Sequence, residues 1–432
     1  MESFDVVVVG GRCAGSPLAT MLARRGINVC VVDRARFPSE TPSTHMIQPC
    51  GVRILDELGV LEALLAAGAV PLRDFTIVSD DVRMDATVDD VAEHPVLCVR
   101  RVTLDVLLLT AAEKAGAHAR TGLRVAGLLR DGDRVTGVQT DKGPIDARLV
   151  VGADGRHSTV GAEVGAQEYH VTSPGRMAAW AYFEGIDRNG LALLGRMKDM
   201  AYLAGATDGD LYMAAIAPDL SRAAEFHADR DRFFTTAIRQ WPELADVMAG
   251  GQRVGPLRAF VNWHGYFRQS AGPGWALIGD AGHFKDFTPG QGIADALRQA
   301  QRLAHSIVDG LGAGSLDREL QRWWRWRDHD AYDMYWYAAR MGQPGPASPW
   351  TNCILREISS DADAAHSFLR ILNHDLPPSK LYTPALALRA AVRTIRQEPR
   401  HATATVKEFF SVAGQTIRQT RQKRNTAPDM AI

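Results

Sequence analysis

The sequence lacks the features that would place the chain in several broad classes. Its five cysteines are scattered, odd in number and without a C-x-x-C pair, so we expect neither a disulfide framework nor a zinc site. No run of about 18 apolar residues occurs, and a strand-like run begins at once, so neither a membrane-spanning helix nor a signal peptide is expected. Positive and negative charges almost cancel, at a net charge of -1, which gives no reason to expect nucleic acid or a membrane surface as the main partner. These absences favour a cytoplasmic globular protein without a metal site.

The composition that remains is that of an ordinary globular protein. Hydrophobic residues make up 46% of the 432 positions, and charged residues make up 23%. A chain of this length can bury a large core and has room for two domains. No internal repeat or low-complexity segment is visible.

The first 33 residues have the pattern of a β-α-β unit. The run FDVVVVG is continuously apolar and β-branched, as in a strand that is buried on both faces. Residues 16–26 carry apolar side chains at helical spacing and end at Gly26, and INVCVVD is a second strand-like run. A right-handed crossover would make the two strands parallel.

The turn of this unit, V-G-G-R-C-A-G-S at residues 9–16, is glycine-rich. A turn of this kind presents backbone N–H groups and a helix N-terminus to a pyrophosphate. Gly10 and Gly15 keep the outer positions of the dinucleotide-binding pattern, and Asp33 follows Gly10 by 23 residues, where an acid can accept hydrogen bonds from an adenosine ribose. Arg12 replaces the middle glycine, and its guanidinium could lie along the phosphates or in solvent.

Two later stretches extend this pattern. Asp154-Gly155 follows a strand-like run, and Gly279-Asp280 follows another, before Pro289-Gly290-Gln291-Gly292 opens a long helix. A carboxylate at a strand end can bind a ribityl hydroxyl, and a glycine-rich helix N-terminus can stabilise negative charge on a reduced isoalloxazine. Three such turns in this order indicate a flavin site.

The segments between these turns suggest a second domain. A helix is predicted over about 103–115, and short strands are predicted around 120–125, 135–140 and 147–151. Residues 176–217 alternate between apolar runs and Gly/Asp turns, as antiparallel strands do. A long helix follows Gly292, and the chain from 313 onward is predicted to be mostly helical.

The ordered motifs, together with Arg101, Leu104 and Asp105 in R-x-x-L-D spacing, resemble a known family over roughly residues 4–310. This is the p-hydroxybenzoate hydroxylase-like group of FAD-dependent monooxygenases, which is related to geranylgeranyl reductases and flavin-dependent halogenases. The resemblance implies an α/β fold, with a Rossmann-like FAD-binding domain, an inserted antiparallel β-sheet substrate domain and a helical C-terminal region. The expected domain limits are 1–75, 96–170 and 272–312 for FAD binding, 76–95 and 171–271 for the substrate sheet, and 313–432 for the helical region.

The resemblance also implies the cofactor and the residues that contact it. FAD would be reduced by NAD(P)H, and a flavin hydroperoxide formed with dioxygen would hydroxylate a small aromatic or polycyclic substrate. Arg101 would steady the cofactor, Asp280 would bind the ribityl chain, and Asp154 is associated in such families with FAD and NAD(P)H. The full set expected to contact the cofactor is Gly10, Gly11, Arg12, Cys13, Ala14, Gly15, Asp33, Arg34, Arg101, Val125, Asp154, Gly279, Asp280, Pro289, Gly290, Gln291 and Gly292.

Other residues are candidates for substrate contacts. No catalytic residue is assigned firmly, but His45 and His283 lie in loops that could reach the flavin, either as a base or as structural histidines. Apolar pockets with a few polar groups suit aromatic substrates, and alternation along the strands places only some of the candidate wall residues on one face. The candidate wall residues are Trp180, Tyr182, Tyr202, Tyr212 and Met213.

Several alternatives remain open at this point. A reductase of isoprenoid-type double bonds would use the same cofactor, whereas a halogenase is less favoured because the W-x-W-x-I-P stretch and the lysine of that family have no match here. A non-enzymatic FAD-binding protein is a further alternative. The aromatic stretch at residues 322–340 is interpreted mainly as a packed helix face, and the basic segment 389–424 mainly as a solvated one, with a membrane or acidic partner as the lesser alternative.

Overall fold

The computed structural model describes residues 2–425, with side chains described through residue 423. A parallel sheet forms the N-terminal half, with strand order β7-β2-β1-β10-β19 and the short antiparallel strand β18 beyond β19. The hairpin β8–β9 joins it through β10. The bounds are β1 Glu2–Val9, β2 Val29–Asp33, β7 His118–Thr121, β8 Val125–Asp131, β9 Arg134–Thr140, β10 Gly143–Gly152, β18 Ala271–Gly272 and β19 Trp275–Leu277.

Helices cover the two faces of this sheet because its central strands are apolar on both sides. Side chains of Val6 and Val8 face one buried cluster and those of Val7 and Val9 face another. The first cluster includes the helices α1 (Gly15–Ala23), α2 (Pro49–Glu57), α4 (Arg101–Lys114) and α9 (Gly292–Gly312), and the second includes α5 (Thr159–Glu163). The nucleotide-binding pattern therefore rests on a rigid two-sided layer.

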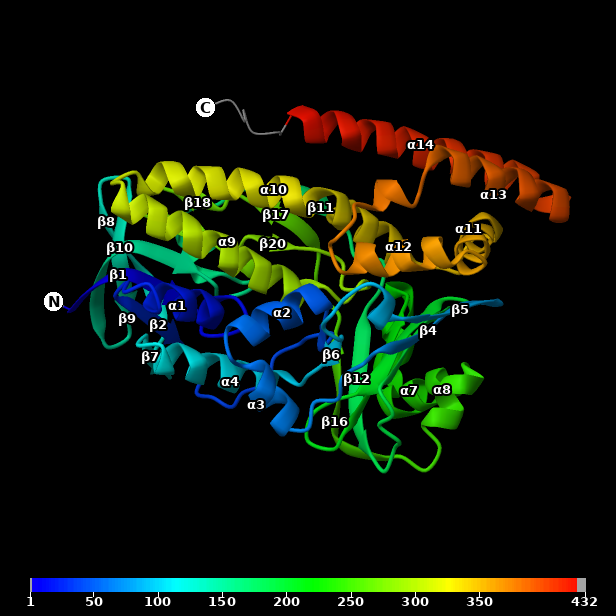
Figure 1. The fold of residues 1–432 in the computed structure, drawn as a ribbon, viewed down its shortest axis with the longest axis horizontal. Coiled ribbons are helices and arrows are strands. Elements are labelled where there is room, and N and C mark those ends of the chain that lie inside the picture. The colour runs from blue at the N-terminus through cyan, green and yellow to red at the C-terminus, as the bar shows by residue number, and fades with distance from the viewer. Residues whose placement is uncertain (1, 426–432) are drawn as a thin grey trace.

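A second sheet of seven strands lies beside the first, on the right in Figure 1. Its order is β16-β12-β15-β14-β13-β4-β5, antiparallel except for the β13–β4 pair. The helices α6–α8 between β15 and β16 were not predicted from the sequence. The bounds are β4 Asp74–Ser79, β5 Val82–Thr87, β12 Ala178–Glu184, β13 Leu191–Met197, β14 Met200–Ala206, β15 Tyr212–Pro218, α6 Ala223–Ala228, α7 Arg230–Arg239, α8 Pro242–Val247 and β16 Gln252–Phe260.

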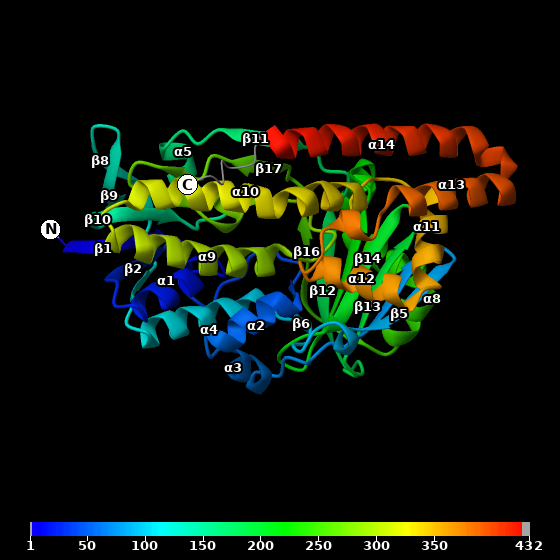
Figure 2. The same ribbon diagram turned by 45° about the horizontal axis from the view of Figure 1, so that its top comes forward.

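Small elements and the C-terminal helices complete the fold. Two short sheets, β3–β6 and β11-β17-β20, lie between the larger parts. The helices α10 to α14 run along the upper side of the molecule in Figure 1. In Figure 2, α13 and α14 lie along its upper edge, and α10 and α12 cross the middle of the view. The bounds are β3 Met46–Ile47, α3 Leu61–Ala66, β6 Leu97–Cys98, β11 Glu168–Thr172, β17 Gly265–Arg268, β20 His283–Phe284, α10 Leu316–Met341, α11 Pro349–Ser359, α12 Ala362–Leu372, α13 Pro384–Gln397 and α14 Ala402–Asn425.

This arrangement confirms the predicted fold class, an α/β chain with an FAD-binding fold and a helical C-terminal region. The helix predicted from about residue 103 begins at Arg101, so the whole R-x-x-L-D motif lies on α4. Among residues 2–425, no helix is both long enough and apolar enough to cross a membrane.

Candidate FAD and substrate site

The turn between β1 and α1 brings three backbone segments into close contact. Gly10 has a φ of +105°, and a Cβ atom there would overlap the carbonyl of Ala153 at the end of β10. A Cβ atom at Gly15 would overlap the carbonyl of Gly10, so the start of α1 packs directly on the turn. Both positions therefore require glycine, and the turn brings backbone N–H groups close to a ligand at the end of the sheet.

Asp33, at the end of β2, binds the backbone of this turn through its carboxylate. Its Oδ2 accepts a hydrogen bond from the Gly11 N–H at 2.8 Å, and its Oδ1 accepts one from Ala35 at 2.7 Å. The side chain is buried, whereas the neighbouring Arg34 is exposed. The carboxylate thus fixes the turn and keeps lone pairs for a ribose hydroxyl.

Arg12 turns away from the backbone of the turn and pairs with α4. Its Nη1 lies 2.6 Å from Asp105 Oδ2, and its Nη2 donates to Ser39 Oγ at 2.7 Å. Arg101 binds the same carboxylate from the other side, at 2.8 Å, and Asp105 is fully buried. Two guanidinium groups share one carboxylate, so one positive charge remains uncompensated beside the turn. The arginine at the middle glycine position is therefore part of a buried ion triad.

This geometry predicts a small effect of Arg12 on FAD affinity. The Arg12→Gly variant restores the usual glycine and leaves the Arg101–Asp105 pair intact, so the dissociation constant of FAD should change by less than about tenfold. Fluorescence titration of the apoprotein measures it. A loss of a hundredfold or more would mean that Arg12 contacts the phosphates directly. Arg25→Gly, at an exposed arginine after the end of α1, is the control.

Asp280 lies in the short turn Gly279–Ala281 that follows β19. Among the described residues its carboxylate has no hydrogen-bond partner, and burial raises its pKa to about 6 although Arg101 and Arg156 oppose this shift. A partly buried carboxylate without a protein partner is costly, and hydroxyl donors would relieve that cost. The residue therefore fits the expected ribityl contact of FAD.

The glycine-rich turn before α9 is held by the protein but open on one side. Gly290 has a φ of +62°, and a Cβ atom at Gly292 would meet nothing within 4 Å. Gln48 Nε2 donates to the carbonyls of Pro289 and Gly290, at 3.3 and 3.4 Å. The helix N-terminus thus faces open space, where the resemblance places the flavin ring.

The side chain of Gln291 points away from this open space. Its Oε1 accepts a hydrogen bond from Lys285 Nζ at 2.7 Å, and its Nε2 donates to the Leu372 carbonyl at 2.7 Å. Lys285 Nζ also lies 2.8 Å from Asp295, which is 2.9 Å from His374 Nε2. Only the backbone of Gln291 is left for a cofactor, while its side chain ties the turn to the end of α12.

The remaining expected cofactor residues lie around the same edge of the sheet. Ala14 and Val125 are buried, and burial raises the pKa of Cys13 to about 11, so this thiol stays protonated. Asp154 accepts hydrogen bonds from Ser158 Oγ at 2.5 Å and from the Thr159 N–H at 2.6 Å. The Asp154 carboxylate thus binds the first backbone N–H group of α5 and the side chain of the residue before it.

An apolar cavity lies between the flavin turn and the second sheet. The space between its side chains, including the open mouth, has a volume of about 460 Å³. Only about 20 Å³ of this space is wide enough for the centre of a water molecule. It is therefore a narrow cleft that a ligand must widen. Its walls come from β3 and the two residues after Ile47, from β4, β13 and β14 of the second sheet, from the segment between β5 and β6, from the flavin turn and from the end of α12. The wall residues are Met46, Gln48, Pro49, Phe75, Val88, Val91, Val96, Leu194, Leu203, Thr288, Pro289, Gly290, Leu369, Leu372 and Asn373.

The aromatic residues expected in the substrate pocket divide between the two faces of the second sheet. Strand pairing places Trp180, Tyr182 and Met213 on the same face as the cavity residues Leu194 and Leu203. Tyr202 and Tyr212 lie on the opposite face. Tyr202 donates to the Ala237 carbonyl of α7 at 2.9 Å, and the neighbours of Tyr212 are core residues. Three of the five thus lie on the face of the sheet that borders the cavity, but none of the five is among its described wall residues.

His45 lies beside the aromatic pair on the cavity side. Its side chain is 1% exposed, its Nε2 is 2.7 Å from the Tyr182 hydroxyl, and its Nδ1 has no partner among the described residues. Burial lowers the pKa of His45 to about 3, so the ring is neutral. When Tyr182 donates to Nε2, the proton of the ring lies on Nδ1. This atom is buried and His45 is not among the described wall residues of the cavity, so a ligand would reach it only where the narrow cleft widens.

His283 occupies a different environment. Its ring packs 4.6 Å from that of Phe267 and 5.8 Å from that of Tyr335 on α10. It is buried, it does not line the cavity, and burial lowers its pKa. These contacts favour a packing role for His283.

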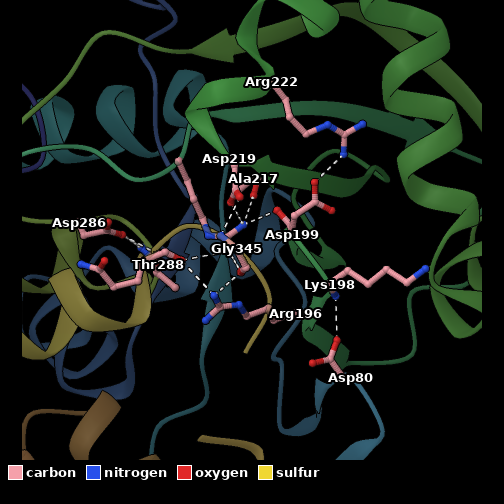
Figure 3. Close-up of polar contacts among 12 residues, drawn as sticks. Asp80, Arg196, Lys198, Asp199, Ala217, Asp219, Arg222, Asp286, Thr288 and Gly345 are labelled. Carbon is pink, nitrogen blue, oxygen red and sulfur yellow. Dashed lines mark hydrogen bonds and ion pairs between the residues drawn. The ribbon is translucent and has the colours of Figure 1, made fainter. Parts of the chain in front are cut away.

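A buried arginine joins the second sheet to the loop after α10. Arg176 is 1% exposed and donates from Nη1 to the carbonyls of Asp199 and Ala217, and from Nη2 to those of Gln343 and Gly345. Figure 3 shows how Arg196, Asp219 and Gly345 gather at this junction, with Asp286 and Thr288 of the flavin loop beside them. The junction fixes the sheet relative to the flavin loop.

Several of these residues were missed by the sequence interpretation. Gln48, Arg176 and the group of Lys285, Asp295 and His374 are isolated polar residues whose partners are distant in the chain. The only local signals are an acid three residues after Gly292 and a lysine seven residues before it. Neither spacing forms a pattern by itself.

Comparison with known proteins agrees with this site. The model of the FAD binding domain family matches residues 3–318. The chain is 26% identical over 334 residues to a tryptophan 2-halogenase of Chondromyces crocatus, covering 73% of this chain and 63% of that protein. It is 35% identical over 171 residues to 6-methylpretetramide 4-monooxygenase of Streptomyces rimosus, covering 36% and 39%. The chain thus spans less than two thirds of the length of these curated relatives.

A solved structure shows the same fold. The flavin-dependent brominase Bmp2 superposes with a TM-score of 0.74 at 17% identity, covering 92% of this chain and 100% of the brominase. Together with the family match, this confirms the resemblance stated from the motifs. The chain belongs to the FAD binding domain family, and FAD is its cofactor.

Proposed function

We propose that the protein is an FAD-dependent, NAD(P)H-consuming monooxygenase that hydroxylates a small aromatic or polycyclic substrate. The observation that carries this proposal is the apolar cavity, because its walls join Pro289 and Gly290 of the flavin turn to the face of the second sheet. A dry cavity beside a flavin protects the reacting oxygen from water. The monooxygenase relative supports the reaction class.

The overall reaction balances without a further reagent. Substrate, dioxygen, NAD(P)H and one proton give hydroxylated substrate, NAD(P)⁺ and water. Bound FAD supplies the transfer of electrons from NAD(P)H to dioxygen. Asp33 and Asp280 would hold its ribose and ribityl hydroxyls, and the N-terminus of α9 would stabilise negative charge on its ring.

The protein residues around the cavity would orient the substrate. Trp180 and Met213 supply apolar surface on the cavity face of the sheet. The neutral His45, joined to the Tyr182 hydroxyl, would exchange a proton with a phenolic substrate through Nδ1 or Tyr182. We also propose a cytoplasmic location, with which the five unpaired cysteines are compatible.

Halogenation is the second candidate because the halogenase relative matches a longer part of the chain than the monooxygenase does. A lysine between flavin and substrate is expected of a halogenase from the resemblance. The cavity walls contain no lysine among the described residues, and the buried Lys285 is held by Asp295 and Gln291. These contacts favour hydroxylation.

The proposal predicts coupled oxygen consumption. Purified holoprotein should oxidise NADH or NADPH faster when a fitting phenol or quinolone is present, and the product should carry one oxygen atom from isotopically labelled dioxygen. Oxygen uptake and mass spectrometry of the product measure this. The His45→Leu variant should retain FAD but form product at least about 100-fold more slowly.

The same assay separates the alternatives. Addition of bromide or chloride should leave the product unchanged, and a halogenated product would establish the second candidate instead. Product formed without oxygen would identify a reductase. Oxidation of NAD(P)H that never couples to any member of the aromatic library would contradict the proposal.

A further inference from the structure

Exposed apolar side chains are concentrated on the last two helices. Of the eight large hydrophobic residues that are exposed in the described part of the chain, five lie on α13 and α14. Phe410 has 67% of its surface exposed, which is the largest fraction in this group. The other four are Leu388, Val392, Val406 and Ile417. Both helices lie along the outer edge of the molecule in Figures 1 and 2.

On each of the two helices, the exposed apolar residues form a row, the apolar stripe, that lies beside the face packed on the protein. Phe409 and Val412 of α14 pack with Trp350 and Ala390 in a small core. Val406, Phe410 and Ile417 are spaced by four and seven residues, so they share one side of α14 next to that packed face. Leu388 and Val392, four residues apart, form a similar stripe on α13. The helices thus have more apolar surface than their packing uses.

Basic side chains accompany the stripes. Glu398 and Glu408 are the only acids between residues 384 and 423. Among the described residues, the exposed Arg389, Arg396, Lys407, Arg418 and Arg421 have no ion-pair partner, and the side chain of Arg424 lies outside the described part. Along α14, Arg421 and Lys407 lie next to the apolar stripe on the side away from the small core. This is the pattern of a helix that lies in a lipid interface.

We propose that α13 and α14 form a docking surface for anionic lipid bilayers. The apolar stripes would enter the acyl boundary, and the unpaired arginines and lysine would bind lipid phosphates. A second copy of the chain fits less well, because a two-fold contact would place each basic surface against itself. The charge of the surface therefore selects an anionic lipid as the partner.

Vesicle binding tests the proposal. The full-length holoprotein should sediment with vesicles of phosphatidylcholine and phosphatidylglycerol, and it should stay in solution with phosphatidylcholine alone. The double variant Phe410→Ser/Ile417→Ser and the triple variant Lys407→Gln/Arg418→Gln/Arg421→Gln should each bind at least about tenfold more weakly. Because these side chains are exposed, both variants should fold, and their FAD content checks this.

Two substitutions elsewhere are matched controls. Val171→Ser removes an exposed apolar residue and Arg232→Gln removes an exposed arginine, and neither should change vesicle binding. No binding of the wild type to anionic vesicles, or equal binding by the variants and the wild type, would overturn the proposal. A wild-type dimer that the Phe410→Ser/Ile417→Ser variant dissociates, without vesicle binding, would assign the surface to a second copy.

Discussion

The Asp280→Ala variant should be purified largely without FAD. Its carboxylate is a partly buried acceptor for which the described residues offer no hydrogen bond, and a charged hydrogen bond to a hydroxyl stabilises a complex by about 1.5–3 kcal/mol. The dissociation constant of FAD should therefore rise roughly 10- to 100-fold. Flavin absorbance per protein and titration of the apoprotein measure the change. Asp309→Ala, an exposed acid on α9, is the control and should retain FAD.

Removal of the Asp280 charge should weaken FAD binding but increase the stability of the apoprotein. Burial raises the pKa of Asp280 from 3.8 to about 6 in the folded protein, so the folded state binds this proton more tightly than the unfolded chain. The cost of ionising Asp280 is absent below about pH 4, grows as the pH rises towards 6, and is complete above it. The Asp280→Asn apoprotein should therefore be more stable than the wild type at pH 8, by up to about 3 kcal/mol.

Chemical denaturation at two pH values tests this stability difference. The gain from Asp280→Asn should be present at pH 8 and nearly absent at pH 4. The loss of FAD affinity should likewise be larger at pH 8, where the wild-type carboxylate is ionised. An Asp280→Asn apoprotein that is less stable than the wild type at pH 8 would show that the carboxylate has a structural partner. A variant that is more stable but still binds FAD normally would remove Asp280 from the cofactor site.

The Arg176→Met variant should be strongly destabilised. The guanidinium is fully buried, satisfies four backbone carbonyls and lies 3.1 Å from Asp219 Oδ1. Methionine replaces only the aliphatic part of this side chain and has no donor. The carbonyls of Asp199 and Ala217 and the Asp219 carboxylate would lose this partner, and those of Gln343 and Gly345 would keep only Arg196. We expect a loss of about 3–5 kcal/mol in the free energy of unfolding, measured by urea denaturation of the holoprotein.

Arg196 provides a matched control at the same junction (Figure 3). Its Nη2 donates to the same two carbonyls, of Gln343 and Gly345, but the side chain is only partly buried. Burial and the nearby charge of Arg176 lower the pKa of Arg196 to about 10, which indicates that the two cations repel each other. Arg196→Met should therefore cost about 1 kcal/mol or less. Equal losses in the two variants would contradict the central role of Arg176.

The motifs predicted the fold of the nucleotide-binding unit because its backbone contacts are local, whereas the contacts of its residues with FAD stay a prediction. Gly10 and Gly15 are required by close backbone contacts within one β-α-β unit, and such contacts leave a fixed spacing in the sequence. The partner of Arg12 could not be predicted in this way. Asp105 belongs to the R-x-x-L-D motif, but only the packing of α4 against α1 brings the two residues together.

The substrate side was harder to predict for a related reason. Alternation along β12, β14 and β15 indicates that neighbouring residues face opposite sides, but it does not say which side faces the flavin. Tyr202 and Tyr212 lie on the side covered by α6–α8, and those helices come from a segment that was expected to be sheet. The cavity also takes residues from β3, the flavin turn and α12, which no single stretch of sequence could reveal.

The side chain of Gln291 joins parts of the protein that are 80 residues apart, because it bonds Lys285 on one side and Leu372 on the other. Asp295 and His374 make a second link between the same two parts. Local opening of the flavin turn must therefore break contacts of the end of α12, and loss of α12 must loosen the turn. The flavin turn and the end of α12 thus form one cooperative unit. Through this unit, thermal fluctuations of the C-terminal helices are coupled to the flavin turn.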